Sequence, residues 1–456
     1  MMTSTSTSAE LRLPGGPVGL PILGDALTYL RDPMGYLVRI RQKYGAVVRL
    51  PLPVYTPILI SDPALLEQVL VTDNKSYVKD AFLRRLAREV VGQGLLTSEG
   101  DFWRRQRRLA QPAFHRERIA EYATIMTTAA MEYVSELRPG QERDLHEDMM
   151  RLTLQIVSRT LFSADVADMA SVVGKSLEAI MSRYADGLLL LFPSLTRLPL
   201  PANRRFNHAV QQLDELLYRM IRERRAEGTA VKRDLLAMLL QAQDEDGSVM
   251  TDLQLRDEAI TLFAAGHETT ALVLSYTFML LSQHPDCAAK LAAELSTVLG
   301  GRVPTLADQA ALRYTEAVVL ESMRLYPPVW ALGREACRDT ELGGYAIPKG
   351  TQVWMSQWVV HRDPAYFPEP EAFRPERWLD GLQRRLPRFA YFPFGGGPRV
   401  CIGNAFAMTE AILLLACIAG RFRMHVKERP PLDLLPSITV RPLHGLHARV
   451  AAAQSV

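Results

Sequence analysis

The chain has 456 residues, of which 48% are apolar and 23% are charged, and its formal net charge is +3. This composition is typical of a soluble globular protein with a large core, and the length allows two or three domains. The small net charge gives no support for nucleic acid as a partner, because such partners require a strongly basic surface.

The cysteines indicate a reducing compartment. Cys287, Cys337, Cys401 and Cys417 form no CxxC pair and no Cys/His spacing suited to zinc. In a chain of this size they do not resemble a disulfide framework either. No stretch reaches the roughly 18 to 20 apolar residues that a membrane-spanning helix needs. We therefore expect a cytoplasmic protein without a membrane span.

The N-terminal part of the sequence predicts an irregular lead-in and then a small sheet. Residues 1–13 have no apolar signal core and are interpreted as a disordered leader. The Pro/Gly-rich run LPGGPVGLPILG, from Leu13 to Gly24, is incompatible with a helix. The β-rich runs AVVRLPL and TPILIS follow, separated by proline, and predict strands.

Helical periodicity dominates from about residue 63 to residue 300. The clearest helix opens at Thr251 and Asp252, both good capping residues, and stops at Pro285. Its span of roughly 30 residues is well above the usual mean of about 12.

The C-terminal third predicts a helix, short strands and irregular chain. A helix is expected from Ala310 to Leu325, ended by a Pro-Pro pair, with the strand-like pieces YAIP and TQVWMSQ after it. A proline-punctuated stretch runs from residue 361 to residue 394, and a last helix begins after Cys401. We predict a mainly α fold with a minor β-sheet built from both ends of the chain. Residues 14–456 are predicted to form one domain, because no repeat or linker interrupts them.

The loop FGGGPRVCIG, from Phe394 to Gly403, holds one cysteine in irregular backbone. A free cysteine is usually a small buried hydrophobe, and we expect that of the other three cysteines. The glycines near Cys401 permit tight turns and inward-pointing amides, and the helix that follows adds its N-terminal positive charge. These features predict a stabilised thiolate of lowered basicity, suited to bind a metal as a single soft ligand.

This loop resembles the haem-binding signature of the cytochrome P-450 superfamily. The fixed positions of the signature are here Phe394, Gly397, Arg399, Cys401 and Gly403. The resemblance implies the cytochrome P-450-like fold, with haem b (iron protoporphyrin IX) between the long central helix and the cysteine loop. It also implies that Cys401 is the axial ligand of the iron. The resemblance covers nearly the whole chain, from the proline lead-in to the last helix.

Glu321 and Arg324 lie three residues apart on the helix that ends before the Pro-Pro pair, so they share a helix face. The spacing alone is compatible with a solvated surface salt bridge, which would contribute little. By resemblance, Arg377 in FRPERW joins them in a buried triad that fixes the irregular stretch beneath the haem.

The run AAGHETT, residues 264–270, places weak helix formers in the middle of the long helix. A threonine hydroxyl in a helix bonds either the carbonyl group one turn back or a ligand. One interpretation is a kink with buried polar residues. By resemblance to the oxygen-activating motif of the family, Glu268 is the acid and Thr269 the alcohol of a catalytic pair.

Haem carries two propionates, and burying them requires hydrogen-bond donors. By resemblance, Trp103 and Arg107 in WRRQR reach a propionate, and Arg334 and Arg399 are the other donors. Charge-assisted bonds from arginine are the strong kind. The remaining arginines beside Arg107 are interpreted either as a solvated helix face or as a docking surface for an acidic electron donor.

The resemblance implies a monooxygenase that inserts one oxygen atom from O₂ into a hydrophobic small molecule by hydroxylation or epoxidation. A terpenoid, a fatty acid or a polyketide would suit an apolar pocket. The family pattern places the pocket walls at apolar positions, which are here Phe82, Phe263, Ala265, Val329, Trp330 and Ile438.

Electrons would come from a ferredoxin or flavodoxin with its reductase, because the chain has no glycine-rich nucleotide loop in a strand-to-helix setting. Two alternatives remain open. A peroxygenase would keep the haem ligation without needing electrons, although such relatives typically lack the acid–alcohol pair. A non-catalytic haem-thiolate sensor would have no use for Glu268 and Thr269.

Overall fold

The computed structural model describes residues 12–53, 56–81, 83–163, 167–184, 195–196, 198–227, 234–243 and 247–453. Most of the predicted leader, residues 1–11, and the predicted pocket residue Phe82 lie outside the described residues.

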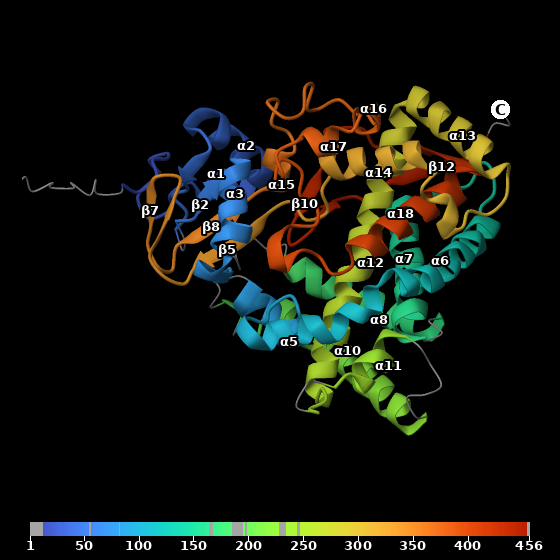
Figure 1. The fold of residues 1–456 in the computed structure, drawn as a ribbon, viewed down its shortest axis with the longest axis horizontal. Coiled ribbons are helices and arrows are strands. Elements are labelled where there is room, and N and C mark those ends of the chain that lie inside the picture. The colour runs from blue at the N-terminus through green and yellow to red at the C-terminus, as the bar shows by residue number, and fades with distance from the viewer. Residues whose placement is uncertain are drawn as a thin grey trace, which may run out of the picture. The chain divides into compact units, whose positions relative to one another are not determined.

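The chain divides into two compact units, each assembled from segments that are distant in sequence (Figure 1). The sheet unit contains Met1–Ala81, Ala331–Val360 and Pro387–Val400. The helical unit contains Phe82–Trp330, His361–Leu386 and Cys401–Val456. A single domain over residues 14–456 therefore stays a prediction, and each unit is described by itself.

A five-stranded sheet of order β1-β2-β8-β5-β3 forms the centre of the sheet unit. β1 (Val47–Arg49) pairs antiparallel with β2 (Ile58–Ile60), which runs parallel to β8 (Gln352–Met355). β8 pairs antiparallel with β5 (Leu332–Ala336), and β5 pairs antiparallel with β3 (Tyr77–Lys79). Strands from the two ends of the chain thus share one sheet, which confirms the predicted minor sheet.

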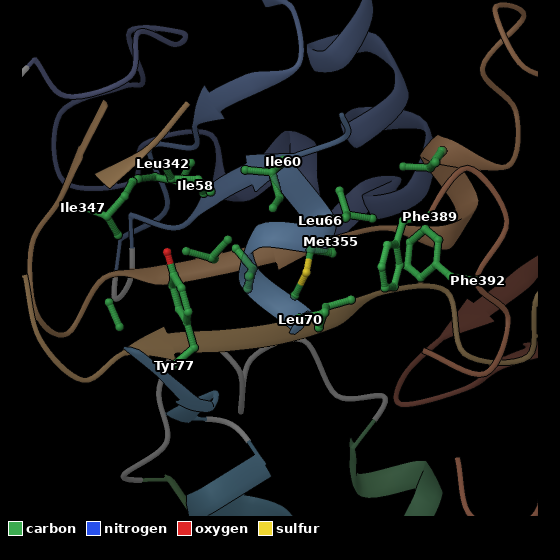
Figure 2. Close-up of a cluster of buried hydrophobic side chains, with 14 residues drawn as sticks. Ile58, Ile60, Leu66, Leu70, Tyr77, Leu342, Ile347, Met355, Phe389 and Phe392 are labelled. Atoms are coloured by element: carbon green, nitrogen blue, oxygen red, sulfur yellow. The ribbon is translucent and has the colours of Figure 1, made fainter. Parts of the chain in front are cut away.

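One face of this sheet carries a cluster of buried apolar side chains (Figure 2). Leu66 and Leu70, from the two helical turns that follow β2, pack into it with Met355 of β8. Burying one such side chain contributes about 1.5 to 3 kcal/mol. Phe389 and Phe392 join the same cluster, with ring centroids 6.3 Å apart. The cluster therefore positions the chain that leads into the glycine loop.

The rest of the sheet unit consists of short elements. The lead-in from residue 13 to residue 24 contains no helix, as its prolines and glycines predict. The YAIP segment is a strand, as predicted, and pairs with its neighbour in a hairpin. The elements are α1 (Ala26–Arg31), α2 (Pro33–Tyr44), α3 (Pro63–Glu67), η1 (Gln68–Thr72), η2 (Asn74–Ser76), β6 (Thr340–Leu342), β7 (Tyr345–Ile347), α15 (Gln357–Val360) and η7 (Gly397–Arg399).

The helical unit confirms the mainly α prediction. Its larger helices are α5 (Gly100–Ala110), α6 (Arg116–Glu136), α7 (Leu145–Phe162), α8 (Ala167–Tyr184), α10 (Pro201–Glu227), α11 (Leu235–Gln241), α12 (Asp252–Gln283), α13 (Pro285–Leu299), α14 (Arg313–Leu325) and α18 (Asn404–Ala419). Its shorter helical turns are η3 (Leu83–Ala87), α4 (Arg88–Val91), η4 (Gln111–Phe114), η6 (Leu306–Asp308), α16 (Glu376–Leu379) and α17 (Leu382–Arg385).

Two small sheets complete the helical unit. β12 (His447–Ala452) pairs antiparallel with both β4 (Glu142–Asp144) and β9 (Phe422–Val426). β10 (Leu434–Pro436) pairs with β11 (Val440–Pro442) in a hairpin. None of the described helices is both long enough and apolar enough to cross a membrane.

The 32-residue helix α12 is the central element of the helical unit and packs against α7, α10, α14 and α18 (Figure 1). Thr251 caps its start in a capping box with Gln254, and it ends at Gln283, two residues before Pro285, as predicted. The expected start of α14 at Ala310 was wrong by three residues. Thr305 and Asp308 cap a separate turn, η6, so the chain enters α14 only at Arg313.

Candidate active site

Cys401 lies two residues before Gly403, the N-cap of α18, in the helical unit. Its thiol is free, and the residue keeps solvent-accessible surface. The backbone amide of Gly403 donates a hydrogen bond to the sulfur, and the guanidinium group of Arg107 interacts with it electrostatically. A soft donor, an amide and a cation therefore meet at the start of α18.

The predicted low basicity of Cys401 was wrong for the polypeptide alone. Burial of the sulfur raises the pKa of the Cys401 thiol, although the Gly403 amide and Arg107 both lower it. The loss of hydration around the sulfur raises the pKa of the thiol more than the two nearby donors lower it. Enough protein surrounds the sulfur for this effect, although solvent still reaches part of the residue. A bound metal cation reverses this balance, since a coordinating thiol loses its proton.

The glycines of the loop before Cys401 are required by geometry in the sheet unit. Gly397 has φ +66°, and a Cβ atom there would lie 1.8 Å from the carbonyl oxygen of Leu70. At Gly396 a Cβ atom would lie 2.2 Å from the ring of Phe389. Only glycine permits this close approach. The cluster in Figure 2 and the glycine loop are thus fitted to each other.

The middle of α12 is open, although most of the helix is buried. Ala265 is exposed and Thr269 is partly exposed, whereas residues 270–281 are all buried. A Cβ atom at Gly266 would meet only the side chain of Val157, at 3.1 Å. The Thr269 hydroxyl donates to the carbonyl oxygen of Ala265 at 2.8 Å. The helix therefore presents a small, accessible face with an alcohol at its edge.

Glu268 is buried and held by two partners from the C-terminal hairpin. The Thr439 hydroxyl and the Arg441 Nε each donate to Glu268 Oε1 at 2.5 Å. Burial raises the pKa of Glu268, but the charge of Arg441 and these hydrogen bonds outweigh it and leave the pKa below its ordinary value. Glu268 is thus an ionised group, and its other oxygen, Oε2, takes neither of these bonds.

The same hairpin gathers three of the predicted pocket segments. Trp330 Nε1 donates to the carbonyl oxygen of Ser437 at 2.8 Å, and the amide of Val440 donates to the carbonyl oxygen of Pro328 at 2.9 Å. Ile438 lies between Ser437 and the Thr439 that bonds Glu268, and it is half-buried. Residues 328–330, the turn 437–439 and the middle of α12 therefore lie together in the helical unit.

Phe263 is placed differently from the other predicted pocket residues. It is buried, and its ring centroid lies 5.4 Å from that of Phe162 at the end of α7 and 6.4 Å from that of His267. These contacts place the ring in the core beside α7. Val329 is half-buried and Ala265 is exposed, and the roles of all these positions toward a substrate stay predictions.

Trp103 and Arg107 lie one turn apart on α5 and are both half-buried. The Arg107 Nε donates to Gln111 Oε1 at 3.2 Å. Burial lowers the pKa of Arg107, and the nearby Cys401 raises it. The structure thus brings Arg107 into range of Cys401. Arg334, Phe394 and Arg399 belong to the sheet unit, and their roles toward a haem stay predictions.

Glu321, Arg324 and Arg377 form two buried ion pairs. Arg324 donates to both oxygens of Glu321 at 2.9 Å, and the Arg377 Nε donates to Glu321 Oε1 at 3.0 Å. Glu321 and Arg324 have no exposed surface (0%). Arg324 also donates to the carbonyl oxygens of His361, Pro370 and Ala372. One charged cluster therefore holds the irregular chain that follows residue 361.

Several partners in the site were missed by sequence reasoning. Thr439 and Arg441, which hold Glu268, lie more than 170 residues away from it in sequence. Trp378, which donates to Glu321 Oε2 at 2.9 Å, directly follows Arg377 and was the one partner with a local signal. No spacing rule connects residues this far apart, so only the folded chain reveals the others.

A family model described as Cytochrome P450 matches residues 14–447. The chain belongs to the cytochrome P450 family. It is therefore a cytochrome P450 monooxygenase, and the cofactor of this family is haem.

Three relatives of this cytochrome P450 are similar over nearly their whole length. The chain is 40% identical to cyclooctatin synthase of Streptomyces melanosporofaciens over 92% of each chain. It is 36% identical to cyclooctat-9-en-7-ol 5-monooxygenase of the same organism, over 90% of this chain and 88% of the relative. It is 33% identical to pentalenene oxygenase of Streptomyces avermitilis, over 95% of this chain and 96% of the relative.

The donor set of this cytochrome P450 fits haem. The parts of the chain that the structure describes contain no group of three or more His, Cys, Asp or Glu side chains able to hold a metal ion. One thiol is too few ligands for a bare ion, but a porphyrin brings four of its own and leaves an axial position to the protein. The accessible, free Cys401 at the start of α18 suits that position.

Proposed function

We propose that this cytochrome P450 oxygenates a hydrophobic terpenoid, by hydroxylation or epoxidation, with electrons from a separate ferredoxin or flavodoxin and its reductase. The observation that carries the proposal is the open face at Ala265 and Thr269 in an otherwise buried helix, in the same unit as the accessible Cys401. The names of the relatives, a cyclooctat-9-en-7-ol 5-monooxygenase and a pentalenene oxygenase, support the terpenoid class.

The first group of residues in this proposal would hold haem and the chain near it. Cys401 would hold haem through its thiolate, and haem held in this way would supply the dioxygen chemistry. Trp103 and Arg107 on α5, with Arg334 and Arg399, would donate to the propionates of that haem. The buried cluster of Glu321, Arg324 and Arg377 fixes the irregular chain that follows residue 361. Its buried hydrogen bonds to main-chain carbonyl oxygens of that segment support this role.

In this proposal Thr269, at the open face of α12, and Glu268, buried beside it, hold and move protons. The Thr269 hydroxyl bonds Ala265 in the resting helix, and rotation about its side chain frees the hydroxyl to donate to a ligand. Glu268 Oε1 is occupied by Thr439 and Arg441, so Oε2 is the oxygen that takes up a proton from solvent and passes it on. A low pKa suits fast release of that proton.

The apolar turn around Ile438, with Val329 and Trp330, forms part of the substrate wall in this proposal. A cytoplasmic setting belongs to the same proposal. Its support is the set of four free cysteines, which need reducing surroundings.

The test is turnover under ¹⁸O₂ with a ferredoxin, its reductase and terpenoids chosen by a spectral binding screen. The proposal predicts a product carrying one ¹⁸O atom and a matching consumption of reducing equivalents. Thr269→Ala is expected to keep consuming electrons while releasing peroxide in place of product. Thr270→Ala is the matched control, because its hydroxyl is buried and bonds Gly266 within the helix.

Two results would contradict the proposal. Turnover with hydrogen peroxide alone, undiminished in Thr269→Ala, would indicate a peroxygenase. Tight binding of terpenoids without any consumption of reducing equivalents would indicate a sensor or carrier.

A further inference from the structure

Asp257 and Glu258, in the first third of α12, have no part in the site described above. Both carboxyl groups are buried, and Glu258 has no exposed surface (0%). A buried carboxylate is costly unless hydrogen bonds compensate for its lost hydration. The partners of these two residues are therefore informative.

Both carboxylates bind the turn that precedes α5, residues 92–97, which we call the latch turn. The amide of Gln93 donates to Asp257 Oδ2 at 2.7 Å, and the amide of Leu95 donates to Glu258 Oε2 at 3.1 Å. The Thr97 hydroxyl closes the turn by donating to the carbonyl oxygen of Gly92 at 2.6 Å. The main chain of the latch turn is thus fixed directly to α12.

The latch turn approaches α12 too closely for side chains. Gly92 has φ +52°, and a Cβ atom there would lie 2.2 Å from the carboxylate of Asp257. At Gly94 a Cβ atom would lie 2.1 Å from the hydroxyl oxygen of Thr261 on α12. The two glycines therefore permit the hydrogen bonds from the turn to the helix.

Glu258 also holds α5. The side-chain amide of Gln106 donates from Nε2 to Glu258 Oε1 at 3.2 Å, and Gln106 has no exposed surface (0%). Gln106 directly precedes Arg107 and follows Trp103 by three residues on α5. One carboxylate therefore binds the latch turn with one oxygen and the helix of the propionate donors with the other.

We propose that Glu258 is a positioning residue whose carboxylate fixes the latch turn and α5 to α12, and so controls how firmly haem is retained as the pH changes. The inference rests on the proposed role of Trp103 and Arg107 as propionate donors. Protonation converts one acceptor oxygen of Glu258 into a hydroxyl donor, which then faces an N–H group and loses that hydrogen bond.

The surroundings of Glu258 bring this change close to neutral pH. Burial raises the pKa of Glu258 to about 7, while the bonds from Leu95 and Gln106 lower it and the charge of Asp257 raises it. Above that pH the carboxylate of Glu258 is ionised and keeps both hydrogen bonds. Below that pH the carboxyl group is protonated and loses one of them.

Most of the other charged groups on the elements around Glu258 have partners of their own or face solvent. Arg256 binds Asp257 at 2.9 Å and also pairs with Asp214 of α10. Arg105 of α5 donates to the Ser248 hydroxyl at 2.8 Å. On α4, Glu89 pairs with Arg183 at 3.5 Å, and Arg88 is exposed.

The experiment compares the haem-loaded wild type with Glu258→Gln, which keeps the shape of the side chain but never carries a charge. The readouts are the rate of haem transfer to excess apomyoglobin from pH 6 to pH 8 and the hydrogen exchange of the Leu95 amide. Wild type is expected to lose haem roughly fivefold to tenfold faster at pH 6 than at pH 8, as the loss of one hydrogen bond to a carboxylate predicts. Glu258→Gln is expected to lose haem fast at both pH values, with faster Leu95 exchange.

Glu178→Gln is the matched control, because Glu178 is exposed on α8 and is expected to retain the wild-type pH profile. If Glu258→Gln does not fold, Gln106→Leu is used instead, because it removes only the hydrogen bond from α5 to Glu258. The inference then requires haem loss at pH 8 to be severalfold faster than in wild type. A wild-type pH profile in Glu258→Gln, or faster Leu95 exchange without a change in haem loss, overturns the inference. Haem binding by wild type and its loss in Cys401→Ser test the proposed function separately.

Discussion

Replacing Glu410 by glutamine is expected to stabilise the protein in a pH-dependent way. Glu410 lies on α18 with no exposed surface (0%), and no described group makes a hydrogen bond of normal geometry to either carboxylate oxygen. Burial raises the pKa of Glu410 from 4.5 to about 8, although the nearby Thr270 hydroxyl lowers it. The folded protein therefore keeps a proton that the unfolded chain has released.

The sign and the size follow from this difference in pKa. Between pH 4.5 and 8 the folded state binds more protons than the unfolded state, so rising pH destabilises the fold. One pKa unit corresponds to about 1.4 kcal/mol, which gives a penalty of about 3 kcal/mol at pH 7 and about 5 kcal/mol above pH 8. Glutamine resembles the protonated side chain at every pH and removes this penalty.

The assay is urea unfolding of haem-loaded wild type and Glu410→Gln at several pH values from 5.5 to 8.5. The difference in free energy of unfolding is expected to grow by about 1.4 kcal/mol per pH unit and to level off above pH 8. Glu178→Gln on the surface of α8 serves as the control, with a small and constant difference. A difference for Glu410→Gln that stays constant across this range would refute the reasoning.

Three further predictions concern the site. Glu321→Gln breaks two buried ion pairs and is expected to lower the free energy of unfolding by about 3 to 5 kcal/mol in urea titrations; an effect below 1 kcal/mol would contradict the buried cluster. Arg441→Met removes the charge that lowers the pKa of Glu268, so the pH–rate profile should acquire an acid-side transition at higher pH, whereas Arg441→Lys should stay close to wild type. Gly397→Ala forces a Cβ atom onto the main chain and should sharply reduce the haem bound per chain, measured from the absorbance spectrum; Gly343→Ala is the control, because it also has positive φ but would meet only a leucine side chain.

The elements that depend on local sequence could be predicted well. The capping box at Thr251 and the proline that follows Gln283 determine the two ends of α12. Prolines in the sequence mark the limits of the strands in the five-stranded sheet. The cysteine loop was also found, because its run of glycines before a lone cysteine is a signal within the sequence itself. The contact that requires glycine at position 397, a close approach to the carbonyl oxygen of Leu70, joins segments more than 300 residues apart and was not predicted.

The prediction was wrong where three-dimensional surroundings decide the outcome. The donors next to Cys401 are local and were seen in the sequence, but the desolvation that raises the pKa of its thiol comes from the whole fold. The ion pair between Glu268 and Arg441 and the bonds from the latch turn to Glu258 join segments more than 150 residues apart. No periodicity or motif encodes contacts of that kind.

The central claim, that Cys401 is the axial ligand of haem iron, is tested most directly by a spectrum. Reduced wild-type protein under carbon monoxide is expected to show the red-shifted Soret band of thiolate ligation, and Cys401→Ser is expected to lose that band while Cys417→Ser, buried within α18, keeps it. A folded wild type that takes up no haem, or a Cys401→Ser variant that retains the red-shifted band, would contradict the account.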